Sequence, residues 1–320
     1  MTEDALAPIR EEIAKAYALA ADQKPRLAVR SFARSRDLVT EVIPTADIDS
    51  AVAREHANYK KEREVYRRLL RNRQTEGDKI VLFGDSLGLP RPEDKTGPTL
   101  GCNITYPWFI TSIQPPQQVD SICQRFFTTD FVLAELEADP DLGRDASVVI
   151  HVGLNDCATR MFLERERIAL ALIPEELRMQ IVGFSQKHRR DIINYLPPHQ
   201  YVPPARFRAN LTKIAVTLQE RQARKIILTT IILPPAKSWP GTPGINRNFA
   251  AYNLEIMEAV QRHDLTLFDF DRHVWQAMHQ DVLVEDGMHL STAGHTLCAQ
   301  KVMALLRQAA PVTAPPIPAS

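Results

Sequence analysis

Three short motifs carry side chains that together could hydrolyse an ester. GDSL (84–87) places Ser86 directly after a short apolar run, and GLND (153–156) places Asn155 after another. DGMH (286–289) has an aspartate three residues before a histidine. A serine nucleophile needs a base that takes its proton, a carboxylate that orients the base and donors that hold the oxyanion. The three motifs supply these groups in the order nucleophile, amide, acid, base.

The roles follow from the residue types. Ser86 would begin a helix, where unpaired backbone N–H groups can stabilise an oxyanion, so we predict it as nucleophile and its N–H as a donor. The amide of Asn155 is the second predicted oxyanion donor. Asp286 can reach the ring of His289, fix its tautomer and stabilise the imidazolium. His295 is a rival base, but it falls inside a predicted helix, so we expect it to pack there.

Each motif also has an ordinary structural explanation. Aspartate and serine in GDSL are good helix N-caps, and Gly, Asn and Asp in GLND are typical of a turn after a strand. DGMH could be a surface loop leading into a helix that Ser291 caps. The ordered combination of all three motifs, rather than any one of them, predicts a hydrolase.

The elements around the motifs predict an α/β protein. Short apolar runs indicate strands at 79–84, 148–153, 225–233 and 265–270, with a weaker candidate near 119–123. Helical patterns separate most of them, at roughly 205–222, 246–263 and 291–309. Continuous apolar strands alternating with helices predict a parallel sheet covered on both faces, and such sheets bind ligands beyond the carboxyl ends of their strands.

Other segments are additional to this sheet. We predict a helical N-terminal extension at 1–78, a hydrolase domain at 79–310 and a disordered tail at 311–320. Within the domain, 157–204 reads as a helical insertion that could form a lid or cap, and 234–244 as an irregular loop rich in proline and glycine.

The extension contains a basic segment. Between residues 54 and 73 there are eight basic and three acidic residues, which could form either a surface for an anionic partner or a solvated helix face. The helix at 48–73 could dock on its own domain or on a second copy, so a homo-oligomer formed through the N-terminal helices is one prediction.

Composition narrows the class of protein. The chain has 320 residues, 44% of them hydrophobic, and 39 basic against 39 acidic side chains. This balance gives no electrostatic argument for binding nucleic acid or an anionic membrane. The N-terminus lacks the apolar region of a secretory signal, no apolar run of 18 residues occurs, and the four cysteines form no CxxC pair. We therefore expect reduced thiols, no membrane span and a cytoplasmic location.

With GDSL, GLND and DGMH in this order, the chain resembles the SGNH/GDSL hydrolase family over roughly 79–309. The resemblance implies a three-layer α/β/α flavodoxin-like domain and ester or thioester hydrolysis through a covalent acyl-enzyme, with no metal or other cofactor. It implies the roles given above for Ser86, Asn155, Asp286 and His289. The family also has a glycine oxyanion donor between the first two motifs, whereas VDSICQRFF (119–127) contains no glycine. Ser121 or Arg125 could occupy that place.

Longer segments resemble a subgroup associated with bacterial surface-polysaccharide biosynthesis. They are GDSLGLPR (84–91), TYPWF (105–109) and GLNDCATR (153–160). This resemblance implies an acyl ester of a carbohydrate as substrate. Asp85, in the first motif, is a candidate for binding that substrate.

Two arginines just beyond the motifs are further candidates for binding substrate. Arg91 and Arg160 could contact a polar or anionic ligand, or each could serve as a structural salt bridge or helix cap.

Three other functions remain open from the sequence. The same residues could transfer the acyl group to a sugar hydroxyl, which water exclusion by the insertion would favour. Asp85, Asn155, Asp286 and His289 are also types that suit a metal-dependent phosphoesterase. The missing glycine and the long helical extension are compatible with a non-catalytic binding or scaffold protein of polysaccharide synthesis.

Overall fold

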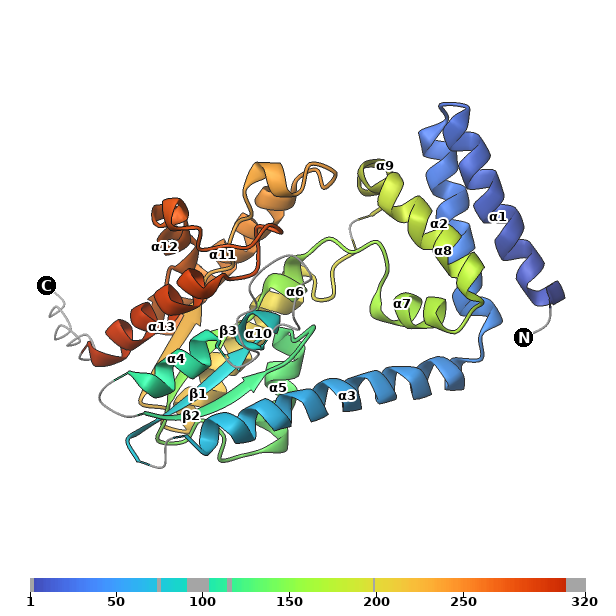
Figure 1. Cartoon of the computed structure of the whole chain (residues 1–320). Coiled ribbons are helices and arrows are strands. Elements are labelled where there is room, and N and C mark those ends of the chain that lie inside the picture. The colour runs from blue at the N-terminus through green and yellow to red at the C-terminus, as the bar shows by residue number, and fades with distance from the viewer. Residues whose placement is uncertain (1–2, 74–75, 91–103, 114–116, 198, 309–320) are drawn as a thin grey trace, which may run out of the picture.

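Five parallel strands form one sheet in the computed structural model, which describes residues 3–73, 76–90, 104–113, 117–197 and 199–308 (Figure 1). The order is β2-β1-β3-β4-β5, as in flavodoxin-like doubly wound sheets. The four predicted strands and the weaker candidate are all present, as β1 (Asp78–Gly84), β2 (Gln117–Cys123), β3 (Ser147–His151), β4 (Lys225–Thr229) and β5 (Thr266–Phe268).

Helices cover both faces of the sheet because alternate strand residues point to opposite sides. Val81 and Phe83 of β1 pack on one face beneath α5 (Thr129–Ala138), α10 (Pro204–Glu220) and α11 (Ile245–Arg262). Ile80 and Leu82 pack on the other beneath α4 (Tyr106–Ser112), α12 (Phe270–Gln276) and α13 (Thr292–Arg307). Strands buried on both faces explain the continuous apolar runs in the sequence. The predicted three-layer α/β/α architecture is confirmed.

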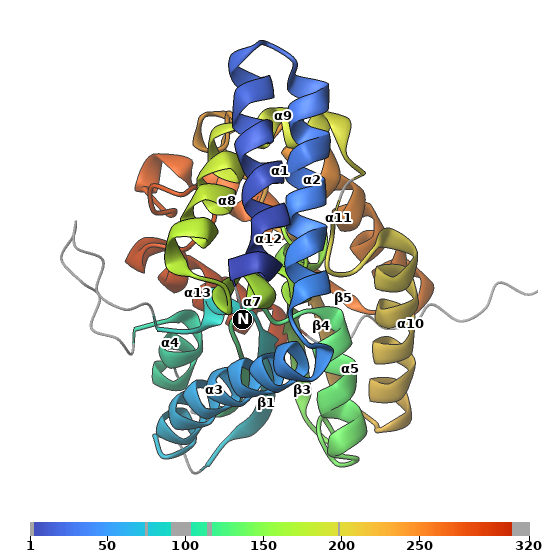
Figure 2. The ribbon, with the colours of Figure 1, turned by 90° about the vertical axis from the view of Figure 1, so that its right-hand side faces the viewer.

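A second apolar core joins two segments that are distant in sequence. Leu6, Ile13 and Phe32 of the N-terminal helices pack with Leu177 and Phe184 of the insertion. Figures 1 and 2 show these helices grouped together beside the sheet. We call the group the helical module; it consists of α1 (Glu3–Ala21), α2 (Pro25–Val42), α7 (Glu164–Ala171), α8 (Glu175–Lys187) and α9 (Arg189–Tyr195).

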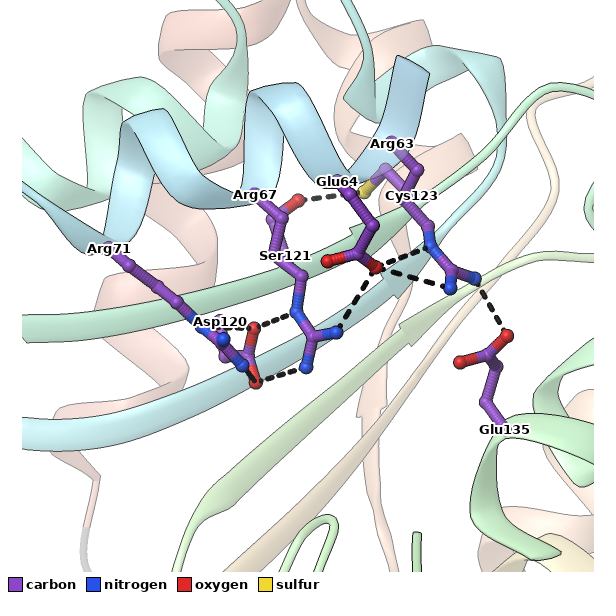
Figure 3. Close-up of polar contacts among 8 residues, drawn as sticks. All are labelled: Arg63, Glu64, Arg67, Arg71, Asp120, Ser121, Cys123 and Glu135. Atoms are coloured by element: carbon purple, nitrogen blue, oxygen red, sulfur yellow. Dashed lines mark hydrogen bonds and ion pairs between the residues drawn. The ribbon is translucent and has the colours of Figure 1, made fainter. Parts of the chain in front are cut away.

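The long helix α3 (Thr45–Arg71) connects the helical module to the sheet and docks on its own domain (Figure 3). Arg67 and Arg71 both donate to the carboxylate of Asp120 on β2, with nitrogen–oxygen distances down to 2.5 Å and 2.7 Å. Arg63 is only 1% exposed, and its guanidinium donates to the carboxylate of Glu135 of α5 at 2.8 Å. Three of the eight basic residues at 54–73 therefore form ion pairs within the described part of the chain.

Some predictions fall outside the described residues, namely those for Arg91, Cys102 and the tail at 311–320. Of the described cysteines, Cys123, Cys157 and Cys298 are free and buried. No helix in the described ranges is both long and apolar enough to cross a membrane.

Candidate active site

The sheet topology brings the first two motifs together. β1 lies between β2 and β3, and its last residue, Gly84, pairs with Cys123 on one side and His151 on the other. Ser86 and Asn155 therefore leave the sheet at the same edge, from neighbouring strands. This edge is the one at which parallel α/β sheets bind ligands.

The third motif reaches the same edge from the far end of the domain. The Oγ atom of Ser86 lies 3.2 Å from Nε2 of His289, although the two residues are 203 positions apart. The Nδ1 atom of His289 lies 2.6 Å from Oδ2 of Asp286. An ionised carboxylate can only accept, so in this pair Nδ1 carries the hydrogen and Nε2 is left to accept from the serine. The structure thus brings together the three residues predicted to be catalytic.

The carboxylate of Asp286 is held in its charged form. Burial alone would raise its pKa, but hydrogen bonds from the ring and backbone N–H of His289, and from the backbone N–H of Met288, outweigh burial. The pKa of Asp286 is therefore held below its usual range. An anionic Asp286 is the form that can orient and stabilise a histidine base.

A tight turn shapes this loop. Gly287 has φ +69, in the left-handed region that glycine adopts at little cost. A Cβ at Gly287 would lie 2.4 Å from Oγ of Ser238. The indole Nε1–H of Trp239 also donates to the backbone carbonyl of Asp286 at 2.8 Å. The loop at 234–244, predicted as irregular, therefore supports the acidic residue of the site.

Ser86 begins only a 3-10 turn, η1 (Ser86–Gly88), and not the α-helix that we expected. Close packing explains the surrounding glycines, since a Cβ at Gly84 or Gly88 would lie 2.7 Å or 2.3 Å from Sγ of Cys123.

Asp85 caps this turn. Its Oδ1 atom accepts from the Leu87 N–H at 2.9 Å, and the residue is 0% exposed. Burial raises the pKa of Asp85 to about 6, against the opposing effect of the Leu87 hydrogen bond. The carboxyl group of Asp85 is thus enclosed by protein, and its contact with substrate stays a prediction.

Asn155 lies in the short helix α6 (Leu154–Cys157). This helix begins directly after Gly153, which has φ +126. The Oδ1 atom of Asn155 accepts from Nη2 of Arg160 at 2.8 Å. Its Nδ2 group donates to the carbonyl of Phe127 at 3.3 Å. One N–H of the amide is therefore used within the protein, and the second can donate to another acceptor.

The strand register decides between the two residues considered for the missing glycine. Ser121 lies inside β2 and pairs with Leu82 of β1, which is four residues before Ser86. The hydroxyl of Ser121 donates to Sγ of Cys123. Arg125 lies beyond the end of the strand, next to Phe126 with φ +56. Of the two, only Arg125 follows the strand end at the edge where Ser86 lies.

Two further predicted residues have structural contacts. His295 is buried in α13, where its Nδ1 accepts from the Tyr106 N–H at 3.2 Å, as expected for a packing residue. Arg160 contacts Asn155 and makes no ion pair within the described part of the chain. Nor do the described residues contain a group of three or more His, Cys, Asp or Glu side chains placed to hold a metal ion.

Sequence reasoning missed Trp239 and Arg189. Arg189 of α9 donates to Oγ1 of Thr242 at 2.8 Å and to the carbonyl of Thr159 at 3.2 Å. Its guanidinium lies 5.9 Å from the centre of the Trp239 ring. These contacts join the helical module to the loop that supports Asp286, and no local pattern in the sequence predicts them.

Comparison with protein families finds a match. The model of the GDSL-like lipase/acylhydrolase family matches residues 121–297, more than half of the chain. The match spans Asn155, Asp286 and His289 and begins after Ser86. No curated protein sequence matches the chain.

Several solved structures resemble the chain at low identity. An acetylxylan esterase from Geobacillus stearothermophilus is 17% identical, with 73% of this chain and 96% of that chain covered and a TM-score of 0.48. An α/β hydrolase from the Lake Arreo metagenome gives the same four values. A lipase/acylhydrolase from Enterococcus faecalis is 19% identical, with 71% of this chain and 94% of that chain covered and a TM-score of 0.47. The family match covers enough of the sequence to decide membership: the chain belongs to the GDSL-like lipase/acylhydrolase family and is an esterase of the GDSL type.

Proposed function

We propose that the chain hydrolyses an acyl ester through a Ser86–His289–Asp286 triad and a covalent acyl-enzyme. The observation that carries the proposal is the continuous hydrogen-bonded path from Ser86 Oγ through the imidazole to the Asp286 carboxylate, at 3.2 Å and 2.6 Å. A nucleophile bonded to a base that a third group orients is the arrangement that activates a serine.

The mechanism has two halves. Nε2 of His289 takes the hydroxyl proton while Oγ of Ser86 attacks the acyl carbon, and the carbonyl oxygen becomes an oxyanion. Asn155 Nδ2 and the Ser86 backbone N–H donate to that oxyanion. His289 then returns its proton to the leaving alcohol oxygen as the ester bond breaks.

Deacylation reverses these roles. His289 takes a proton from water, and the water oxygen attacks the acyl carbon. The second tetrahedral intermediate collapses, the carboxylic acid leaves, and Ser86 regains its proton from His289. Asp286 stays ionised throughout and stabilises the imidazolium.

The alcohol part of the substrate is proposed to be a carbohydrate. This rests on the resemblance of the segments at 84–91, 105–109 and 153–160 to proteins of surface-polysaccharide synthesis. Comparing an acetylated sugar with an acetylated simple alcohol as substrates tests it; equal kcat/KM for the two would remove the sugar from the proposal.

Labelling by a fluorophosphonate probe tests the triad directly, because it requires an activated serine and an accessible site. We expect labelling of the wild-type chain and its loss in Ser86→Ala and His289→Ala, together with loss of 4-nitrophenyl acetate hydrolysis. Ser50→Ala, which removes an exposed serine of α3, is the matched control and should label normally. Full labelling and turnover by folded Ser86→Ala would contradict the proposal.

A further inference from the structure

Arg160 is fixed by several contacts at the base of the insertion. Its backbone N–H donates to the carbonyl of His199 at 2.8 Å, which pairs the two ends of the insertion. Its guanidinium lies 4.7 Å from the ring centre of Tyr201 and 5.9 Å from that of Phe126. Cation–π contacts of this kind hold a guanidinium without neutralising it.

This positive charge has no carboxylate partner within the described ranges. The Nε atom of Arg160 is buried without a hydrogen-bond acceptor, and its Nη2 donates to the neutral amide of Asn155. By contrast, Arg67 of α3 and Arg167 of α7 form ion pairs with Asp120 and Glu55. Burying a charge without a partner costs stability, so such a charge calls for a functional explanation.

The electrostatic surroundings agree with the geometry. Burial lowers the pKa of Arg160 from its usual value. The same guanidinium acts at longer range on the pKa of Asp85, next to Ser86, without an ion pair between them. The charge of Arg160 therefore lowers the pKa of Asp85, the residue that precedes Ser86.

The contact with Asn155 gives that charge a specific effect. A guanidinium has only donors, so it can bind the oxygen of the amide but not its nitrogen. The 2.8 Å bond to Oδ1 thus fixes which side of the amide carries the N–H groups. It also draws electron density toward Oδ1, which makes the N–H groups better donors.

We propose that Arg160 is a positioning residue of the oxyanion hole, which orients and polarises the Asn155 amide and whose charge is balanced only when the oxyanion forms. This rests on the proposed function and extends it to a residue that does not touch the substrate. Preorganised charge aimed at developing negative charge lowers the barrier without strengthening ground-state binding. It also compensates for the absence of a glycine donor at 119–127.

Substitution should separate catalysis from stability. With neutral 4-nitrophenyl acetate we expect Arg160→Met to lower kcat by about 10- to 100-fold while KM changes by less than about 2-fold. Arg160→Lys should recover part of the loss, since it keeps a charge but lacks the planar donor group. The melting temperature of Arg160→Met should stay the same or rise, because an unpaired buried charge is removed. Arg208→Met, which removes an arginine of α10 whose side chain is 54% exposed, is the control for activity and should leave kcat and KM unchanged.

A double-mutant cycle tests the route through the amide. If Arg160 acts through Asn155, adding Arg160→Met to Asn155→Ala should cause little further loss of kcat. Three results would overturn the proposal: fully additive losses, a fall in kcat that only follows a fall in folded fraction, or a rise in KM confined to anionic esters. The last would make Arg160 a substrate-anion binding group.

A readout without turnover keeps this inference separate from the proposed mechanism. In protein labelled with ¹⁵N-asparagine, the side-chain amide of Asn155 should shift and exchange faster with solvent in Arg160→Met. It should stay unchanged in Arg208→Met. An unaltered Asn155 signal in Arg160→Met would overturn the positioning role, whether or not the enzyme cleaves the esters tested. A failure to cleave any ester would count against the proposed function and not against the positioning role.

Discussion

The carboxylate of Asp286 forms two hydrogen bonds with His289, one to its ring and one to its backbone. Oδ2 lies 2.6 Å from the ring Nδ1, and Oδ1 accepts the backbone N–H of the same histidine at 2.9 Å. A spacing of three residues allows both bonds because the intervening turn passes through Gly287 in the left-handed region. The orientation of the imidazole is thus set within a single turn of chain.

Replacing Asp286 should therefore remove the orientation of the base. We expect Asp286→Asn to lower kcat by about 10⁴-fold, because an amide can donate to Nδ1 and so favour the wrong tautomer. Steady-state hydrolysis of 4-nitrophenyl acetate measures the loss. Asp281→Asn makes the same change in a neighbouring exposed loop, at φ +50 where asparagine is tolerated, and should leave kcat unaltered. A loss below about 10-fold in Asp286→Asn would argue against its role.

The turn itself can be tested at Gly287. A methyl group there would lie 2.4 Å from Oγ and 2.8 Å from Cβ of Ser238, in a backbone conformation that alanine resists. We expect Gly287→Ala to lower kcat at least about 10-fold and destabilise the fold by about 1–2 kcal/mol. Gly241→Ala is the control, because nothing lies within 4 Å of its added Cβ. Equal activities for the two variants would show that the turn does not position the catalytic groups.

The docking of α3 depends on the ion pairs of Asp120. Burial alone would raise the pKa of Asp120, but the hydrogen bonds from Arg67 and Arg71 outweigh it and lower the pKa. A depressed pKa means that this stabilisation is complete above the unfolded value of about 3.9 and is lost as the pH falls below it.

Asp120→Asn should thus cost about 3 kcal/mol at neutral pH, since two arginines lose their shared carboxylate. Chemical denaturation at pH 7 measures the loss, and hydrogen exchange should show α3 opening before the sheet. Asp78→Asn, which breaks the exposed pair with Arg224, should cost less than about 1 kcal/mol. Equal losses of unfolding free energy in the two variants would show that the ion pairs of Asp120 do not hold α3 on the sheet.

Asp156 should make stability fall as the pH rises. Burial raises its pKa from 3.8 to about 7, although Thr129 donates to Oδ1 from both its N–H and its hydroxyl. Between these two values the folded protein binds more protons than the unfolded chain, so raising the pH destabilises the fold.

Asp156→Asn cannot titrate, so its melting temperature relative to wild type should increase from about pH 4 to about pH 7 and level off above that. Thermal melts across this range measure the difference. Asp141→Asn changes an exposed carboxylate and should show a constant difference. A constant difference for Asp156→Asn as well would mean that Asp156 is ionised at both ends of the range.

Local sequence was sufficient for much of the fold. Apolar runs predicted four strands, because a strand buried on both faces is largely apolar, and β2, which contains Asp120 and Ser121, was only a weaker candidate. The motifs predicted Ser86, Asn155 and the Asp286–His289 pair because strand ends and turns place such residues at one edge of a parallel sheet. Within Asp286–His289 the spacing alone implied the contact, since the turn is local.

Contacts between distant segments needed the tertiary structure. Ser86 begins a 3-10 turn, and Gly84 and Gly88 on either side of it pack against Cys123 from another strand, a contact that no local propensity encodes. The N-terminal helices and the insertion share one core because their apolar faces meet in space.

Register and side-chain direction also came only from the structure. They turned Ser121 inward and joined Arg160 to Asn155. The sequence by itself thus determined the strands, the motif residues and their order, because periodicity and turn chemistry act over a few neighbouring positions. Tertiary structure alone decided which distant side chains support them, since that depends on how separately formed elements pack together.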